Sequence, residues 1–262
     1  MPPAILHDPA ETMEGAHVLW ECRGELGLVL WRTVRDLSLW AATPPDKRGH
    51  LFTMESVVRR VEELTDTLLP DAIASPVDTL NGMLTLGVGA DASIVTICCL
   101  EVATWARRER LAHTAIAFAQ AGALVCPDFA EAALYTGVCA SEAEQDARAV
   151  SWLRRALTLA RREKDGRAYA ASLAALGAIY ERVPAGISRA EWYYRKAFKA
   201  GRRFGSRDAR VQALRGLRRI ALARGDDDGA EWFALAARRQ RRPRSGSPDS
   251  FRESADDTEH EQ

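Results

Sequence analysis

Small residues recur along this chain at fixed intervals, and this spacing restricts the fold more than any other feature of the sequence. Members of the first set are 12, 4 and 3 residues apart, and a second set repeats these intervals 34 residues later. A small residue lets one helix backbone approach another, so the period predicts antiparallel helix pairs stacked in a row. The four sets are Ala103, Ala115, Ala119 and Gly122; Gly137, Ala149, Leu153 and Ala156; Gly177, Ala190, Tyr194 and Ala197; and, more faintly, Arg218, Ala230, Ala234 and Ala237.

Residues 95–240 resemble the tetratricopeptide family. Leu176 and Gly177 stand where that family has its Leu-Gly pair, and Tyr194 matches a position of its second helix. Later units depart from the pattern, because Arg218 replaces a small residue and the intervals lengthen from 34 to 41 and 40 residues. The resemblance implies an all-α, right-handed α-solenoid whose first helices line a concave groove. It also implies a noncatalytic role in protein-protein interaction, as an adaptor, scaffold or regulatory module.

Composition and hydrophobic periodicity divide the chain into three segments. Residues 1–90 predict an amino-terminal helical extension, with helices over 12–42, 54–69 and 76–86, the last capped by Ser75. This extension is expected to cover the apolar face of the first repeat. Residues 91–244 form the repeat array. Residues 245–262 are rich in Ser, Pro and acidic side chains, a composition typical of disorder, so we expect a disordered acidic tail.

No arrangement of side chains predicts catalysis or metal binding. The five histidines and five cysteines lack metal-ligand spacing, and the glycine-rich stretch at 82–89 does not follow a strand. We therefore expect no enzyme activity, no metal and no cofactor. The odd number of cysteines favours a reducing, cytoplasmic location, and no apolar run is long enough to predict a membrane span. The excess of arginine over lysine suggests a bacterial, GC-rich source.

A net charge of zero hides strong segregation of charge along the chain. Residues 1–147 carry 10 basic and 21 acidic side chains, residues 148–244 carry 25 and 9, and residues 245–262 carry 1 and 6. The resulting charges are −11, +16 and −5. A field of this size in the array attracts acidic groups, so the expected partner is an acidic protein or peptide.

By the tetratricopeptide resemblance, five arginines of the first helices are candidates to line the groove and bind acidic side chains of a partner. Two alternatives remain open. The acidic and basic halves can pair within one molecule or in a homo-oligomer, which would make the chain a self-associating structural scaffold, or the basic segment can bind nucleic acid or another polyanion. No helix-turn-helix signature favours nucleic acid. The five candidates are Arg107, Arg108, Arg182, Arg215 and Arg219.

The acidic tail offers a competitor for such a partner. It follows the basic array directly, and the short connection gives it a millimolar effective concentration. We therefore expect that the tail can occupy the concave groove in the free protein.

Tryptophans supply a second candidate surface. Trp20, Trp31 and Trp40 lie in the first predicted helix but do not share one stripe, so part of this aromatic surface is expected to be exposed for a partner or a second copy. Trp192 and Trp232 hold equivalent repeat positions, which favours a repeated packing role.

Overall fold

A computed structural model describes residues 16–53, 55, 58, 62, 64, 66–86 and 89–241. Over these residues the chain is all α-helical apart from turns and one 3-10 helix, with no strand. The helices are α2 (Gly24–Ala42), η2 (Pro45–His50), α4 (Asp71–Leu86), α5 (Ala92–Arg108), α6 (Ala112–Val125), α7 (Ala130–Glu142), α8 (Asp146–Arg162), α9 (Gly166–Arg182), α10 (Ile187–Arg203), α11 (Arg207–Ala223) and α12 (Asp227–Arg241).

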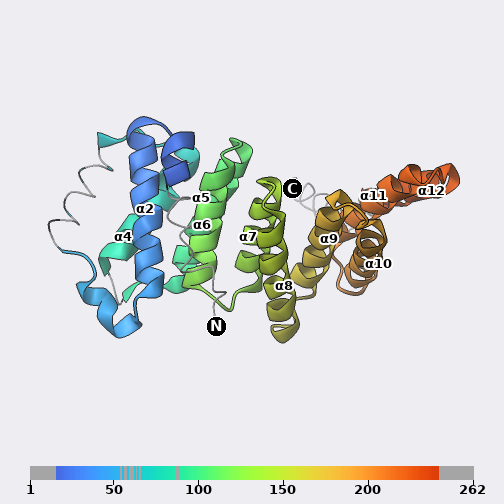
Figure 1. Cartoon of the computed structure of the whole chain (residues 1–262). Helices are drawn as coiled ribbons and strands as arrows, with labels where there is room; N and C mark the ends of the chain where they lie inside the picture. Colours follow the sequence, from blue (N-terminus) through green and yellow to red (C-terminus); the bar gives the residue numbers. More distant parts are fainter. Residues whose placement is uncertain are drawn as a thin grey trace, which may run out of the picture.

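The helices from α5 onward form consecutive pairs that run along the molecule (Figure 1). Each first helix packs on its own second helix, and the first helices α5, α7, α9 and α11 also contact one another in sequence. The second helices α6, α8 and α10 each pack on the first helix that follows. This is a solenoid-like arrangement, so the predicted all-α solenoid is confirmed.

One type of turn ends four of these helices. The amide of Leu111 donates to the carbonyl of Ala106, and the same five-residue step recurs from Gln145 to Ala140, from Asp165 to Ala160 and from Asp226 to Ala221. The residue before each donor has positive φ, namely Arg110, Glu144, Lys164 and Gly225. These are Schellman-type ends, which turn the chain sharply into the next helix. Of these four residues only Gly225 is a glycine, so only this turn could be predicted from the sequence.

The amino-terminal extension departs from the predicted helix over 12–42. Residues 16–21 are helical, the chain then breaks at Cys22 and Arg23, and α2 begins at Gly24. Gly24 has φ of +69°, and a Cβ on Gly27 would lie 1.6 Å from the carbonyl oxygen of Cys22. Both glycines therefore permit a sharp break that hydrophobic periodicity does not register. Residues 12–15 lie outside the described part of the chain.

The two later predictions for the extension also need adjustment. The predicted helix over 54–69 lies partly outside the described residues, although those that are described between 55 and 66 are helical. The helix expected to begin at Pro76 begins at Asp71 instead, so Ser75 is not its cap. The carbonyl of Pro70 accepts the amides of Ile73 and Ala74 and starts the helix, and Pro76 removes only one donor from it.

The extension covers the first helix pair. Helix α2 packs on α4 and α6, and one apolar core runs from Val18 to Cys139. The carboxylate of Glu21 accepts the amides of His113 and Thr114 at 2.9 and 2.8 Å, and so caps the N-terminus of α6. This contact ties the extension to the repeat array.

Tyr194 on α10 packs between two glycines of neighbouring first helices. A Cβ on Gly177 of α9 would lie 2.7 Å from the Tyr194 ring, and a Cβ on Gly216 of α11 would lie 2.2 Å from it. The predicted helix contact at Gly177 is confirmed. Gly137 is an equivalent contact, where a Cβ would lie 2.7 Å from the Leu153 side chain. In the last unit Arg218 is exposed, and the close approach of Gly216 on α11 is to Tyr194 of the preceding unit.

Replacing Gly177 with alanine is therefore expected to destabilise the protein despite the higher helix propensity of alanine. We expect Gly177→Ala to lower the free energy of unfolding by about 1–3 kcal/mol, because the tyrosine ring cannot move away freely. Gly82→Ala is the matched control, since a Cβ there meets no atom within 4 Å, and it is expected to stabilise by about 0.5–1 kcal/mol. Urea denaturation followed by circular dichroism measures both values, and equal effects would contradict the packing described for Tyr194.

Candidate functional site

A cavity opens where three successive first helices lie side by side. It has a volume of about 490 Å³ and we call it the first-helix cavity. Its walls come from α7, the turn after α7, α9, α10 and α11. The lining residues are Val138, Ser141, Glu142, Glu144, Ala174, Ala175, Ala178, Arg182, Tyr194, Gln212, Arg215 and Arg219.

The structure brings three of the five predicted arginines together in this cavity. Arg182, Arg215 and Arg219 line it. Arg107 lies beside it, because its guanidinium pairs with the lining residue Glu142. Arg108 is exposed in the last turn of α5 and does not line the cavity. The tetratricopeptide resemblance thus selected positions that converge in space, with Arg108 as the exception.

Acidic side chains in the same place balance much of this positive charge. Glu142 and Glu144 are part of the lining, and Glu142 accepts a hydrogen bond from Nε of Arg107 at 2.7 Å. Nη1 of Arg107 donates to the Tyr135 hydroxyl at 3.1 Å. Hydrogen bonding to Glu142, followed by that to Tyr135, raises the pKa of Arg107 in spite of its burial. The cavity is therefore mixed in charge, whereas the sequence predicted a basic surface.

Another cluster joins α9, α10 and α11. Arg219 donates two hydrogen bonds to the carboxylate of Glu181, at 2.6 and 2.8 Å, and Tyr194 donates its hydroxyl proton to Glu181 at 2.7 Å. Burial opposes ionisation of Glu181, but the bonds from Arg219 and Tyr194 outweigh it and lower the pKa of Glu181. Burial and then the bond to Glu181 raise the pKa of Tyr194. Glu181 therefore stays ionised and holds Arg219 in place.

Arg182 completes a ladder of ion pairs along the first helices. Its guanidinium pairs with Asp146 at the start of α8 and donates to the Ser141 hydroxyl at 3.0 Å. Pairs between adjacent units therefore involve Arg107, Arg182 and Arg219. These contacts orient three guanidinium groups and link each helix pair to the next.

A second hollow adjoins the first and has a different charge. It measures about 240 Å³, and Arg215 lines both spaces. The other charged residues of its lining are Arg218 and Arg238, and no acidic residue is among them. We call it the adjoining hollow. Sequence reasoning missed Arg218 as a site residue because it was taken for a substituted helix contact, and Arg238 because it lies on a second helix.

The tryptophans of the extension do not form one exposed surface. Trp20 is 79% exposed and meets His17 edge-on, whereas Trp31 is half-buried under the guanidinium of Arg35. Trp40 is only 1% exposed and lies beneath Arg48, so its prediction as an exposed partner contact is wrong. It falls on the apolar stripe of α2, which packs against the core.

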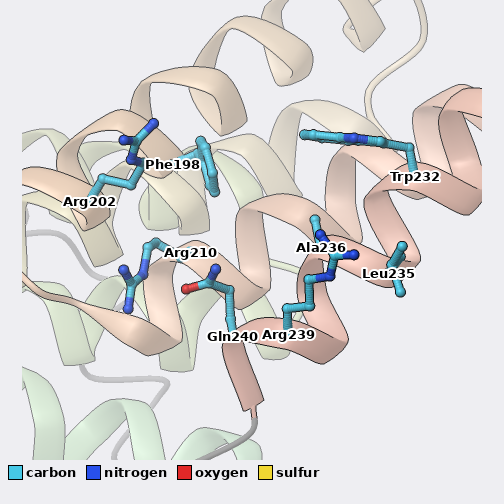
Figure 2. A pocket seen from close by; sticks show the side chains of 8 residues that line it. All are labelled: Phe198, Arg202, Arg210, Trp232, Leu235, Ala236, Arg239 and Gln240. Carbon is cyan, nitrogen blue, oxygen red and sulfur yellow. The ribbon is translucent and has the colours of Figure 1, made fainter. Parts of the chain in front are cut away.

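Trp192 and Trp232 lie on the surface instead of packing between repeats. They are 53% and 59% exposed, so the predicted packing role is wrong. Trp232 lines a third space of about 300 Å³, the terminal pocket, together with Phe198, Arg202, Arg210, Leu235, Ala236, Arg239 and Gln240. Figure 2 shows Phe198 and Trp232 projecting into this pocket from different helices. The equivalent repeat positions of Trp192 and Trp232 are therefore both exposed at the surface.

The cysteines and the metal-binding residue types show no reactive cluster. All five cysteines are free, and four are buried. Burial raises the pKa of Cys139 to about 12 and also raises that of Cys99. In the described ranges no three His, Cys, Asp or Glu side chains gather as a metal site would require. None of the helices seen there has the length and apolar character needed to cross a membrane.

Comparisons with known proteins support the fold alone. No family model matches the chain, and no curated protein matches it. Among solved structures it is similar to the crystal structure of BtubC (BKLC) from P. vanneervenii, with a TM-score of 0.54 and 16% sequence identity. The similarity covers 92% of this chain and 97% of that protein. The extension and the array together thus follow an arrangement of helices that another protein also has.

Glu181 gives the site a measurable pH dependence. Its pKa lies below the ordinary value of 4.5 in the folded protein, so its stabilising contribution is present above that value and is lost as the pH falls through the lowered pKa. We expect Glu181→Gln to reduce the free energy of unfolding by about 1 kcal/mol near neutral pH, a figure kept small because the pair is partly exposed. At about pH 3 the difference from the unaltered protein should shrink.

Urea denaturation at the two pH values measures this difference. Glu101→Gln is the control, because Glu101 is exposed on α5 and has no hydrogen bond or ion pair with another described residue. A loss that is the same at both pH values would contradict the role assigned to the Glu181 carboxylate.

Proposed function

We propose that this chain is a noncatalytic protein-interaction module that binds an acidic peptide segment of a partner. The segment lies along the first-helix cavity and continues into the adjoining hollow. The observation that carries the proposal is the position of Arg215, which lines both spaces and is exposed. Arg218 and Arg238 extend the positive surface on one side of it.

The resemblance of the helix pairs to tetratricopeptide repeats supports this function. Gly137 and Gly177 hold the small-residue positions of the spacing that resembles the family. Both lie at close contacts between helices, which only a small residue permits. Rows of first helices in such arrays form extended binding surfaces. The similarity to BtubC adds support for the fold, and the function rests on the cavity.

The geometry suits an extended peptide with spaced carboxylates. A volume of about 490 Å³ is within the usual range of about 300–1,000 Å³ for binding pockets, and it accommodates a few side chains. Alanines of α9 form an apolar floor, while Arg215 and Arg218 offer guanidinium groups that bind carboxylates in bidentate fashion. Glu142 and Glu144 at the far side repel a peptide that is acidic throughout, so the expected ligand carries its carboxylates toward α11 and α12.

Free cysteines fit the location that we propose, a reducing cytoplasm. The proposal assigns no cofactor, no metal and no catalytic residue. Polyanion binding is the alternative outcome of the peptide selection.

Selection from a library of random 12-residue peptides tests the function. We expect selected peptides to be enriched in Asp and Glu, and their affinity to weaken as salt shortens the screening length from about 30 Å at 0.01 M to about 8 Å at physiological ionic strength. Arg215→Glu should weaken binding about tenfold or more. Lys199→Glu is the matched charge reversal, because Lys199 is exposed on α10 and lines none of the three spaces.

Three results would overturn the proposal. The first is a selection without acidic enrichment, and the second is binding that Arg215→Glu and Lys199→Glu weaken equally. The third is tighter binding of a mixed-sequence single-stranded DNA than of any selected peptide, with the same dependence on Arg215. That third result would establish the polyanion alternative.

A further inference from the structure

The terminal pocket combines apolar walls with positive charge and no negative charge. Phe198, Trp232 and Leu235 supply the apolar part, and Arg202, Arg210 and Arg239 supply three guanidinium groups. No acidic side chain is among its lining residues. This distinguishes it from the first-helix cavity, where glutamates stand among the arginines. The pocket therefore suits a ligand that carries both an apolar side chain and carboxylates.

Arg210 is held in the pocket wall with an unused hydrogen-bond donor. A Cβ on Gly201 would lie 2.8 Å from Cγ of Arg210, so the glycine makes room for the arginine stem on α10. Nε of Arg210 is buried and has no hydrogen-bond partner among the described residues. A buried donor without a partner carries a desolvation cost, so packing and not a hydrogen bond at Nε holds the Arg210 side chain in this wall. Figure 2 shows the Arg210 side chain at the edge of the pocket, near Gln240.

The pocket also lies at the end of the array. Helix α12 is the last described helix, and no further helix of the described part covers its outer side. Trp232 and Leu235 are 59% and 48% exposed there. Terminal units of stacked repeats need a cover for their apolar face.

The chain itself continues from this place with a matching sequence. Gln240 lines the pocket, and the acidic segment 245–262 begins five residues later. Its only large apolar side chain is Phe251, flanked two residues away on each side by Asp249 and Glu253. Residues two apart in an extended chain project to the same side, so the three side chains can enter one site together.

The connection is long enough to allow return of the chain to the pocket. Phe251 lies eleven positions after Gln240, with ten residues between them. This connection spans at most about 38 Å when extended, and about 18 Å as a flexible chain. Such a tether gives an effective concentration in the millimolar range, so even weak contacts are occupied.

We propose that the segment around Phe251 binds in the terminal pocket of its own chain. Phe251 packs between Phe198 and Trp232, while Asp249 and Glu253 accept hydrogen bonds from the guanidinium groups that line the pocket. The segment thereby covers the exposed end of the array. This site differs from the concave groove that the sequence suggested for the tail, and the reason is charge: Glu142 and Glu144 stand among the arginines there, whereas arginines are the only charged residues that line the terminal pocket.

Photocrosslinking in the full-length protein tests the proposal. The photoreactive amino acid p-benzoylphenylalanine replaces Phe251, and mass spectrometry maps the crosslinked residues after irradiation. Crosslinks are expected within one chain to residues of the terminal pocket, above all around Trp232 and Leu235. Arg239→Glu in the same protein should reduce them about tenfold, and so should raising the salt to about 0.5 M. Lys199→Glu should leave them unchanged, and circular dichroism verifies that both variants are folded.

Other crosslinking patterns would overturn the proposal. Crosslinks to Ala175, Gln212 or other residues of the first-helix cavity would place the tail in the groove. Crosslinked dimers on a denaturing gel would show that the pocket takes the tail of a second copy. Peptide binding at Arg215 can succeed or fail independently of either result, so this experiment and the peptide selection report on separate sites.

Discussion

The close contact of Tyr194 with two glycines is the constraint on which the carboxyl-terminal half of the array depends. Its ring occupies the space that side chains on Gly177 and Gly216 would fill, so one aromatic residue sets the distance between α9, α10 and α11. The hydroxyl at the far end of the same ring bonds to Glu181, which in turn holds Arg219. Packing in the core and orientation of a surface arginine are therefore fixed by a single side chain.

Much of the fold was predictable because small residues recur at fixed intervals in the sequence. Gly177 and Gly137 are small because a neighbouring side chain occupies their space, and this requirement is visible without coordinates. Breaks between helices were harder to foresee. Arg110 and Lys164 adopt positive φ without being glycine, and α4 continues through Pro76 because only one donor is missing there. At these positions the free energy of the local turn or helix outweighs the conformational preference of the individual residue.

The location of the site was predictable from the sequence, whereas its mixed charge was not. Their positions within the repeat predicted that Arg182, Arg215 and Arg219 lie on first helices. In the structure all three line the same cavity. Their ion pairs come from residues 36 or 38 positions away, such as Asp146 and Glu181, and a charge count along the chain cannot register such distances. The exposure of Trp192 and Trp232 escaped prediction for a different reason: equivalent repeat positions share an environment, and repetition alone does not tell a packed environment from an exposed one.

The ladder of ion pairs has a mechanical consequence. Arg107, Arg182 and Arg219 each join one helix pair to the next, so each ion pair opposes a change in the distance between neighbouring pairs. Between α9 and α11 the pair of Arg219 with Glu181 acts together with the packing around Tyr194. A change in the angle between neighbouring helix pairs must therefore lengthen or break one of these ion pairs.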